Sequence, residues 1–211
     1  MKLQRTTLIL LLLALSLGGF VYFYEVQGAS QQQLALTKQQ QIFSFEEEQV
    51  QAFTVKTQKQ KLLFERGVKA GKSLWRMKAP SNTLASEASV SYLMNLLVKG
   101  KSNRTIHVPA TQLQEYGLNQ PQATIEVKLK NQQTHQLVLG KPDFNRNFLY
   151  AQADPSAKPN GNVDVLLVPT DFENAVNRQL SEWKSQEASE SSSSEETTPK
   201  ESAKASPSPS P

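Results

Sequence analysis

The stretch Ala123–Leu139, ATIEVKLKNQQTHQLVL, is the most regular part of this 211-residue sequence. Apolar residues alternate with polar ones on both sides of a turn at Asn131-Gln132. The alternating set is Ala123, Ile125, Val127 and Leu129 before the turn, and His135, Leu137 and Leu139 after it. A period of two is typical of a strand with one buried face, and a short polar turn joins two such strands. The stretch therefore predicts an antiparallel hairpin with one face in the core.

A similar alternation marks strands on both sides of this hairpin. Phe53 and Val55 share one face of the first strand, and polar residues 58–60 form the turn to the second. Residues 67–72 form a looser turn, and Pro80 ends a three-stranded β-meander. The predicted strands outside the hairpin are 50–57, 61–66, 74–78, 104–108, 148–152 and 163–168.

The first predicted helix covers about residues 86–98. Ser86 is a candidate N-cap, and Lys99-Gly100 is a favourable C-terminal end. Between them an apolar stripe recurs at helical spacing and can pack on the meander, formed by Val90, Leu93, Met94 and Leu97.

A second helix is predicted from a capping box, Thr170 to Glu173, and ends near Arg178. Residues 110–116 predict one or two helical turns that end at Gly117. The fold class is therefore α+β, with antiparallel sheet and two packed helices. The order of the elements suggests a duplicated βββ(β)α unit.

The chain divides into four parts by composition. The C-terminal part is rich in Ser, Glu, Lys and Pro, and it cannot bury enough apolar surface to offset the entropy of ordering. We therefore expect it to be disordered. The four parts are a membrane anchor at 1–25, a Gln-rich stalk at 26–41, the α+β domain at 42–184 and the tail at 185–211.

The anchor prediction depends on the uncharged run Leu8–Tyr24. As a helix it would reach roughly 25 Å, close to the ~30 Å of a hydrocarbon core. Lys2 and Arg5 precede it, which places the N-terminus in the cytoplasm and the body on the periplasmic or lumenal side of the cell or thylakoid membrane. The alternative is a signal peptide cleaved before Ala29, which the bulky aromatic residues near that site disfavour.

Charge and cysteine content narrow the classes of partner. The chain has no Cys, which excludes disulfides and thiolate metal sites. Residues 26–184 hold 19 basic and 13 acidic side chains, a balance of +6. Such a body favours anionic head groups or an acidic partner, although an ordinary solvated surface is the alternative. The lysines are not clustered among aromatics, so nucleic acid is not expected.

No motif predicts catalysis, and the sequence predicts a protein that is not an enzyme. The two histidines, His107 and His135, fall on separate predicted strands, and no serine lies in a nucleophile elbow. His135 shares the apolar phase of its strand and is interpreted as a hydrogen-bonded core or edge residue. No spacing matches a metal site or a phosphate-binding loop. No catalytic, cofactor-binding or metal-binding residue is therefore predicted, and no small-molecule substrate is evident.

One loop stands out as a candidate contact with a partner protein. The segment 141–150, KPDFNRNFLY, concentrates aromatic and charged residues around a predicted turn. Exposed aromatic and Arg side chains are good contact anchors. The alternative is a turn whose rings pack inward. The candidate contact residues are Asp143, Phe144, Arg146, Phe148 and Tyr150.

Two short motifs resemble a known family. The segments Trp75–Pro80 and Tyr116–Pro121 are similar to the W-x-x-x-x-P and Y-G-L-x-x-P signatures of DUF4340, a domain of unknown function. The resemblance covers roughly residues 1–184 and is strongest to short cyanobacterial members. It implies a membrane-anchored envelope protein of no established activity, with an accessory role suggested by members encoded beside ABC transporters. It supplies no catalytic residues.

The leading functional hypothesis is a non-enzymatic, single-pass membrane protein whose extracytoplasmic domain binds or scaffolds a membrane complex. It rests on the predicted anchor, the ordinary core and the absence of a recognisable site. The alternatives are an envelope hydrolase with an unrecognised site and a module that binds polysaccharide or lipid.

Overall fold

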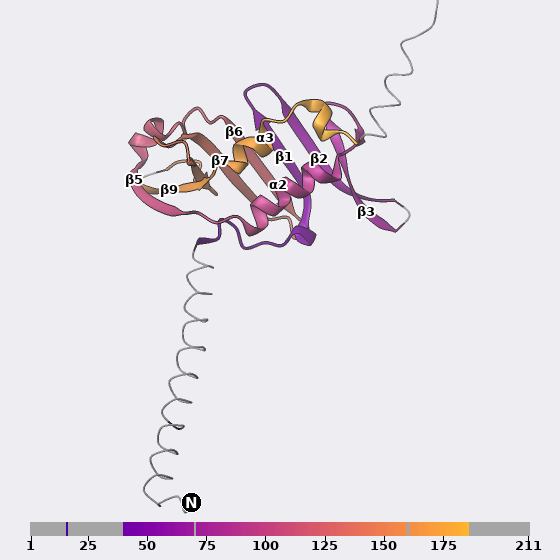
Figure 1. Ribbon diagram of the computed structural model, residues 1–211, viewed down its shortest axis with the longest axis horizontal. Coiled ribbons are helices and arrows are strands. Elements are labelled where there is room, and N and C mark those ends of the chain that lie inside the picture. Colours follow the sequence, from indigo (N-terminus) through magenta and orange to yellow (C-terminus); the bar gives the residue numbers. More distant parts are fainter. Residues whose placement is uncertain (1–15, 17–39, 70, 160, 186–211) are drawn as a thin grey trace, which may run out of the picture.

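The computed structural model describes residues 16, 40–69, 71–159 and 161–185 (Figure 1). Within these residues nine strands form one antiparallel sheet. The strands are β1 (Val50–Thr57), β2 (Lys61–Lys69), β3 (Lys72–Ala79), β4 (Thr83–Leu84), β5 (Arg104–Pro109), β6 (Ala123–Leu129), β7 (Thr134–Pro142), β8 (Phe148–Ala153) and β9 (Asn162–Pro169). The α-helices are α2 (Glu87–Lys99) and α3 (Asp171–Val176), and the 3₁₀ helices are η1 (Glu47–Gln49), η2 (Ala110–Tyr116) and η3 (Leu180–Trp183).

The strand order is β4-β3-β2-β1-β6-β7-β8-β9-β5. The predicted hairpin is therefore β6–β7, and β6 pairs with β1 at the middle of the sheet, with Phe53 opposite Val127. From this central pair one meander runs through β1–β4 and is followed by α2, and another runs through β6–β9 and is followed by α3. This α+β arrangement with an antiparallel sheet confirms the predicted fold class. β5 joins the outer edge beside β9.

The main core lies between α2, α3 and one face of the sheet (Figure 1). The apolar stripe predicted on α2 faces this core, and all four of its residues are fully buried. Phe53 and Phe64 stack at 4.5 Å between ring centroids, and Trp75 meets Phe53 edge-on at 5.1 Å. Burial of a large apolar side chain stabilises a fold by about 1.5–3 kcal/mol, so this layer dominates the stability.

A second, smaller cluster covers the opposite face of the sheet at its β5 end. It contains Val108, Leu113, Leu118, Val138 and Val165. Val138 lies between two core residues of β7 and points away from them because side chains alternate along a strand. η2 supplies Leu113, so both faces of this end of the sheet are covered.

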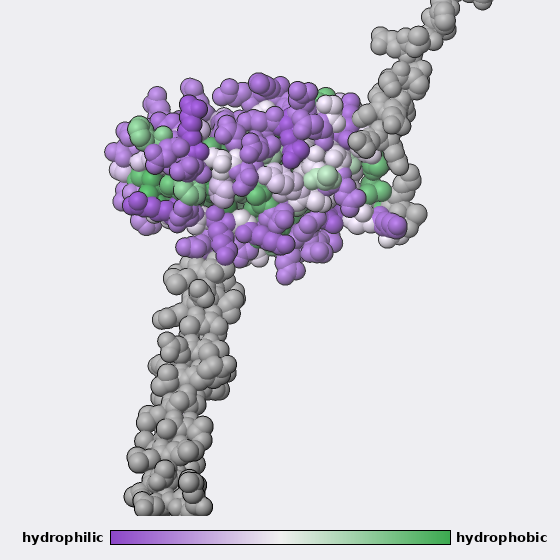
Figure 2. Space-filling view, viewed as in Figure 1, coloured by the Kyte–Doolittle hydropathy of each residue, from purple (hydrophilic) through white to green (hydrophobic). Residues whose placement is uncertain are grey.

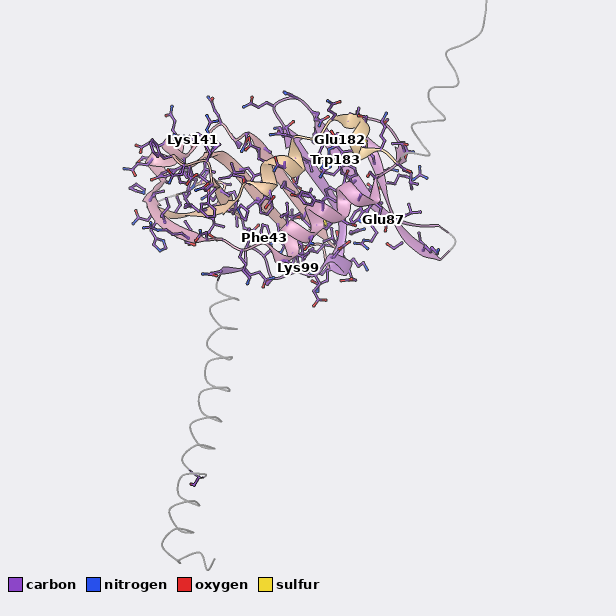
Figure 3. All side chains as sticks on the ribbon, viewed as in Figure 1. Phe43, Glu87, Lys99, Lys141, Glu182 and Trp183 are labelled. Atoms are coloured by element: carbon purple, nitrogen blue, oxygen red, sulfur yellow. The ribbon has the colours of Figure 1, made fainter. Side chains whose placement is uncertain are left out.

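The C-terminal segment returns across the sheet to its other end. The N–H of Ser86 donates to the carbonyl of Trp183 at 2.9 Å, and the N–H of Ser185 donates to the carbonyl of Leu84 at 2.9 Å. Trp183 is 0% exposed, with its ring 5.1 Å from that of Phe64. Figure 3 labels Trp183 and Glu182 on this segment and Glu87 at the start of α2. The part of the chain that follows α3 is thereby held against the β4 end of the sheet.

Two local predictions at the helix ends are confirmed. Ser86 is the N-cap of α2, and its Oγ accepts the N–H of Ser89 at 3.4 Å. Gly117 ends η2 with a left-handed φ of 71°. α2 also ends at Lys99, but Gly100 has an extended backbone; glycine is required there because a Cβ would collide with the carbonyl oxygen of Leu96.

The predicted capping box at Thr170 is wrong. Thr170 already has a helical backbone, with φ −63° and ψ −13°, and its side chain makes no capping hydrogen bond. An N-cap residue needs an extended backbone to aim its side chain at the first free N–H groups. The second helix also ends earlier than predicted, at Val176, and η3 follows it as a separate element.

The predicted turn at 67–72 is also wrong for most of its length. Gly67, Val68 and Lys69 continue β2 and pair with Leu74, Ser73 and Lys72 of β3. The ladder of backbone hydrogen bonds to the neighbouring strand outweighs the weak strand propensity of Gly and Lys. The two-residue strand β4 gave no periodic signal and was not predicted.

All of the predicted anchor except Ser16, most of the predicted stalk and nearly all of the predicted tail lie outside the described residues. Within the described ranges, no helix combines the length and the apolarity needed to cross a bilayer. The chain enters the described body beside the end of α2, where Ser102 donates its N–H to the carbonyl of Gln40 at 2.7 Å.

Candidate functional site

The candidate contact loop is the turn between β7 and β8, and Asp143 holds its shape. One carboxylate oxygen of Asp143 accepts the N–H groups of Asn147 at 2.8 Å and Phe148 at 3.1 Å. The backbone of Asp143 also donates to Phe148 and accepts from Arg146. Arg146 adopts a left-handed φ of 58°. These bonds fix the turn, and they occupy the carboxylate that the sequence offered as a partner contact.

The structure separates the five predicted contact residues into two groups. Phe144 is 99% exposed, and Arg146 is exposed beside it in the same turn. Phe148 is half-buried, while the ring of Tyr150 meets that of Tyr116 edge-on at 4.9 Å and packs on the second cluster. The surface available to a partner is therefore the exposed tip, Phe144 and Arg146. Asp143 holds the backbone of the turn by hydrogen bonds, and Tyr150 packs on the second cluster.

This turn lies far from the place where the chain enters the body. Figure 3 labels Lys141, which precedes the turn, at the opposite edge of the body from Phe43 and Lys99. The N–H of Ile42 donates to the carbonyl of Gly100 at 3.1 Å, so Phe43 and Lys99 mark the point of entry. Lys141 and the point of entry therefore lie at different edges of the body.

The two histidines are not brought together. Nδ1 of His107 lies 2.6 Å from a carboxylate oxygen of Asp164 on the exposed surface of β5 and β9. Nδ1 of His135 lies 2.8 Å from Asp154. The His135 ring also lies about 5.5 Å from those of Phe43 and Phe45, which matches its interpretation as a hydrogen-bonded residue at the edge of the core. In the described part of the chain no three His, Cys, Asp or Glu side chains gather as metal ligands.

A groove of about 1000 Å³ lies at the β3 end of the body and was missed by the sequence analysis. Its walls come from β3, the start of α2 and the segment after α3, so its members are far apart in the sequence. Arg66 lies in it with its guanidinium 4.6 Å from the centre of the Trp75 ring, and it donates to the carbonyls of Val50 and Glu47. Arg178 pairs with Glu182 at 3.5 Å. Arg178 is thus paired with a carboxylate and Arg66 is hydrogen-bonded to the backbone. The lining of the groove holds no histidine.

The packing of the two α-helices shifts the pKa of one side chain, Tyr92. Tyr92 of α2 donates its hydroxyl to Asp171 of α3 at 3.2 Å. Burial, followed by this hydrogen bond and the charge of Asp171, raises the pKa of the Tyr92 phenol, and Arg178 opposes the rise. Arg178 stacks 5.2 Å from the Tyr92 ring. The Tyr92 hydroxyl therefore links α2 to α3.

The family-like motifs have structural explanations. A Cβ on Gly117 would lie 2.8 Å from the backbone nitrogen of Lys141, and a Cβ on Gly140 would collide with the carbonyl oxygen of Tyr116. The Tyr116–Pro121 motif therefore packs backbone to backbone on the end of β7. Trp75 packs its ring in the main core and under Arg66.

A protein-family model described as "Domain of unknown function (DUF4340)" matches residues 75–193. The match begins at Trp75, within β3, and includes the rest of β3, β4 to β9, both α-helices and the C-terminal segment. No curated protein and no solved structure matches the chain.

Proposed function

Since the chain belongs to the DUF4340 family, whose function is unknown, we propose a function from its own surface: it is a non-enzymatic, single-pass membrane protein whose extracytoplasmic domain binds or scaffolds a membrane complex. The observation that carries this proposal is the Phe144 tip. A fully exposed phenyl ring on a turn tied by four hydrogen bonds has no stabilising role in the domain that presents it.

The tip has the physical properties of a contact anchor. Burial of one aromatic side chain in a partner's pocket is worth about 1.5–3 kcal/mol. The Asp143 hydrogen bonds have already ordered the turn, so binding loses little further conformational entropy. Arg146 adds a planar cation that can pair with a carboxylate at the rim of such a pocket.

The proposal also includes a membrane topology. Residues 8–24 would lie in the membrane, with the N-terminus in the cytoplasm and the domain on the periplasmic or lumenal side. The expected partner is a subunit of a membrane complex, such as an ABC transporter, that extends into that compartment.

An envelope hydrolase is the second candidate, because the His107–Asp164 pair is exposed and a carboxylate on Nδ1 orients the imidazole of many hydrolases. A polysaccharide-binding role would call for several exposed rings near the turn, whereas Phe144 is exposed and Tyr150 is packed.

The test is affinity purification of the full chain from gently solubilised membranes, with mass spectrometry of the retained proteins. We expect a stoichiometric partner that is lost with Phe144→Ala. Val68→Ala is the matched control, since Val68 is also exposed, at 77%, but lies on the β2–β3 hairpin. Retention of the partner by Phe144→Ala, or recovery of the bare protein after crosslinking, would contradict the proposal.

A further inference from the structure

β5 is the open edge of the sheet. It is last in the strand order, and among the described residues its only strand partner is β9, from Arg104 opposite Leu167 to Pro109 opposite Asn162. At the other end of the sheet, Ala85 and Lys184 form a bridge beside the short strand β4, whereas the bridge between Gln41 and Lys101 lies before β5 and does not include its residues. An edge strand presents a row of backbone N–H and C=O groups that another strand can pair with.

The register shows which backbone groups of β5 face outward. The N–H of Ala110 donates to the carbonyl of Gly161 at 2.9 Å, in line with the β5–β9 ladder. Because pairing alternates along antiparallel strands, Val108, Ile106 and Arg104 direct their N–H and C=O groups to β9. Thr105 and His107 direct theirs away from the sheet.

The side chains agree with this assignment. Residues of a non-hydrogen-bonded pair have closer side chains, and His107 and Asp164, which are opposite each other, approach to 2.6 Å. Pro109 also falls on an outward position, where its missing N–H removes no bond to β9. The outward groups are thus the N–H and C=O of Thr105 and His107 and the C=O of Pro109.

The surroundings of this edge indicate what would pair with it. Thr105 and His107 are exposed, and Ile106 is half-buried against the second cluster. Figure 2 shows hydrophobic surface gathered at this end of the body, where β5 and β9 lie. Lys101 and Arg104 are exposed, and within the described ranges neither has an ion-pair partner.

The geometry points to β5 as a site of strand addition for an acidic, extended segment of a partner protein. The segment pairs antiparallel with Thr105 and His107, places a β-branched residue opposite Ile106 and carries a carboxylate opposite Arg104. Backbone hydrogen bonds supply the affinity, and the alternating side chains supply the selectivity. This edge is distinct from the Phe144 tip, and the inference does not depend on the function proposed for that tip.

The first test uses a synthetic peptide, acetyl-SITVTEE-amide, labelled for fluorescence anisotropy with the full chain in detergent micelles. In the antiparallel register its third and fifth residues face His107 and Thr105, and its fourth faces Ile106. We expect a dissociation constant below about 1 mM. N-methylation of the third and fifth amides removes both donors to β5 and should weaken binding at least about tenfold. N-methylation of the second and fourth amides, which point outward, is the matched control and should have little effect.

The second test changes the protein. Thr105→Pro removes an outward N–H without touching the β9 ladder and should also weaken binding at least about tenfold, whereas Thr105→Ala keeps the N–H and should bind normally. Arg104→Glu should reverse the preference, so that acetyl-SITVTKK-amide binds better than the acidic peptide.

Absence of binding, or equal binding of the two N-methylated peptides, would overturn the inference even if Thr105→Pro failed to fold. Sedimentation of the full chain addresses a second occupant. A dimer that Thr105→Pro dissociates would mean that the edge pairs with a second copy, and the partner proposed here would be wrong.

Discussion

The two edges of the sheet differ in whether another segment of the chain covers them. At the β4 end, the chain's own C-terminal segment supplies a neighbour: Ser185 donates to Leu84, Ser86 donates to Trp183, and the Trp183 side chain is fully buried. At the β5 end, both faces of the sheet are covered, but no described strand pairs with the outer edge of β5, and the exposed Phe144 turn belongs to the same half. The closed end therefore contributes buried contacts that stabilise the fold. The open end carries the surfaces that are available for recognition.

The substitution Trp183→Ala should break the closed end and have the largest effect. A buried Trp replaced by Ala loses apolar contacts and leaves a cavity, which typically costs about 3–5 kcal/mol. We expect a loss of this size in the free energy of unfolding, measured by urea denaturation. Phe144→Ala is the matched control, since its ring is exposed, and should change stability by less than about 0.5 kcal/mol. Similar losses for both variants would disprove the contrast between the two ends.

The second prediction tests the packing beneath the open end. Gly140→Ala places a Cβ against the carbonyl of Tyr116 and 3.2 Å from Leu118 Cδ2. The Tyr116–Leu118 backbone must move, and we expect a cost of about 1–3 kcal/mol by thermal or urea unfolding. At Gly67, on the β2–β3 hairpin, a Cβ would meet only Leu74 Cδ1, at an ordinary 3.8 Å, so Gly67→Ala should be nearly neutral. A neutral Gly140→Ala would mean that η2 is free to shift.

The third prediction compares the two helix starts. Ser86 caps α2 with its Oγ, so Ser86→Ala should destabilise the protein by about 0.5–1 kcal/mol. The backbone bond from Ser86 to Trp183 is kept in this variant. Thr170 makes no side-chain cap on α3, and Thr170→Ala should be close to neutral. Urea denaturation of the two variants checks this order. A larger loss of stability for Thr170→Ala than for Ser86→Ala would indicate a capping box at Thr170, which the structure does not contain.

The sequence predicted the elements whose signal is local. The period of two in β6 and β7 and the helical stripe of α2 each lie within a single segment, and both are confirmed. Ser86 was recognised as a cap because a short side chain before an amphipathic helix is a local pattern. Thr170 had the same pattern, but the tight passage from β9 into α3 gave it a helical backbone.

Features that depend on distant residues could not be predicted in this way. The open edge of β5 follows from its pairing with β9, some 60 residues later in the chain. The burial of Tyr150 and the exposure of Phe144, six residues apart, depend on where η2 places Tyr116. The sequence therefore placed several aromatic residues around one turn but could not show which of their rings would be exposed. The groove likewise combines β3, α2 and the C-terminal segment.

The smallest expected effect concerns the hydrogen bond between Tyr92 of α2 and Asp171 of α3. Because the folded state raises the pKa of Tyr92 above its unfolded value of 10.0, the native protein holds this proton more tightly. The resulting stability is fully present below about pH 10 and is lost as pH rises through the folded-state pKa. Tyr92→Phe has no proton to lose. The stability advantage of the natural protein over Tyr92→Phe should therefore shrink as the pH rises above about 10, by a small amount because the group is exposed to solvent. Urea midpoints measured for both proteins across this range would show it, and a constant difference would mean that the Asp171 contact does not hold the proton.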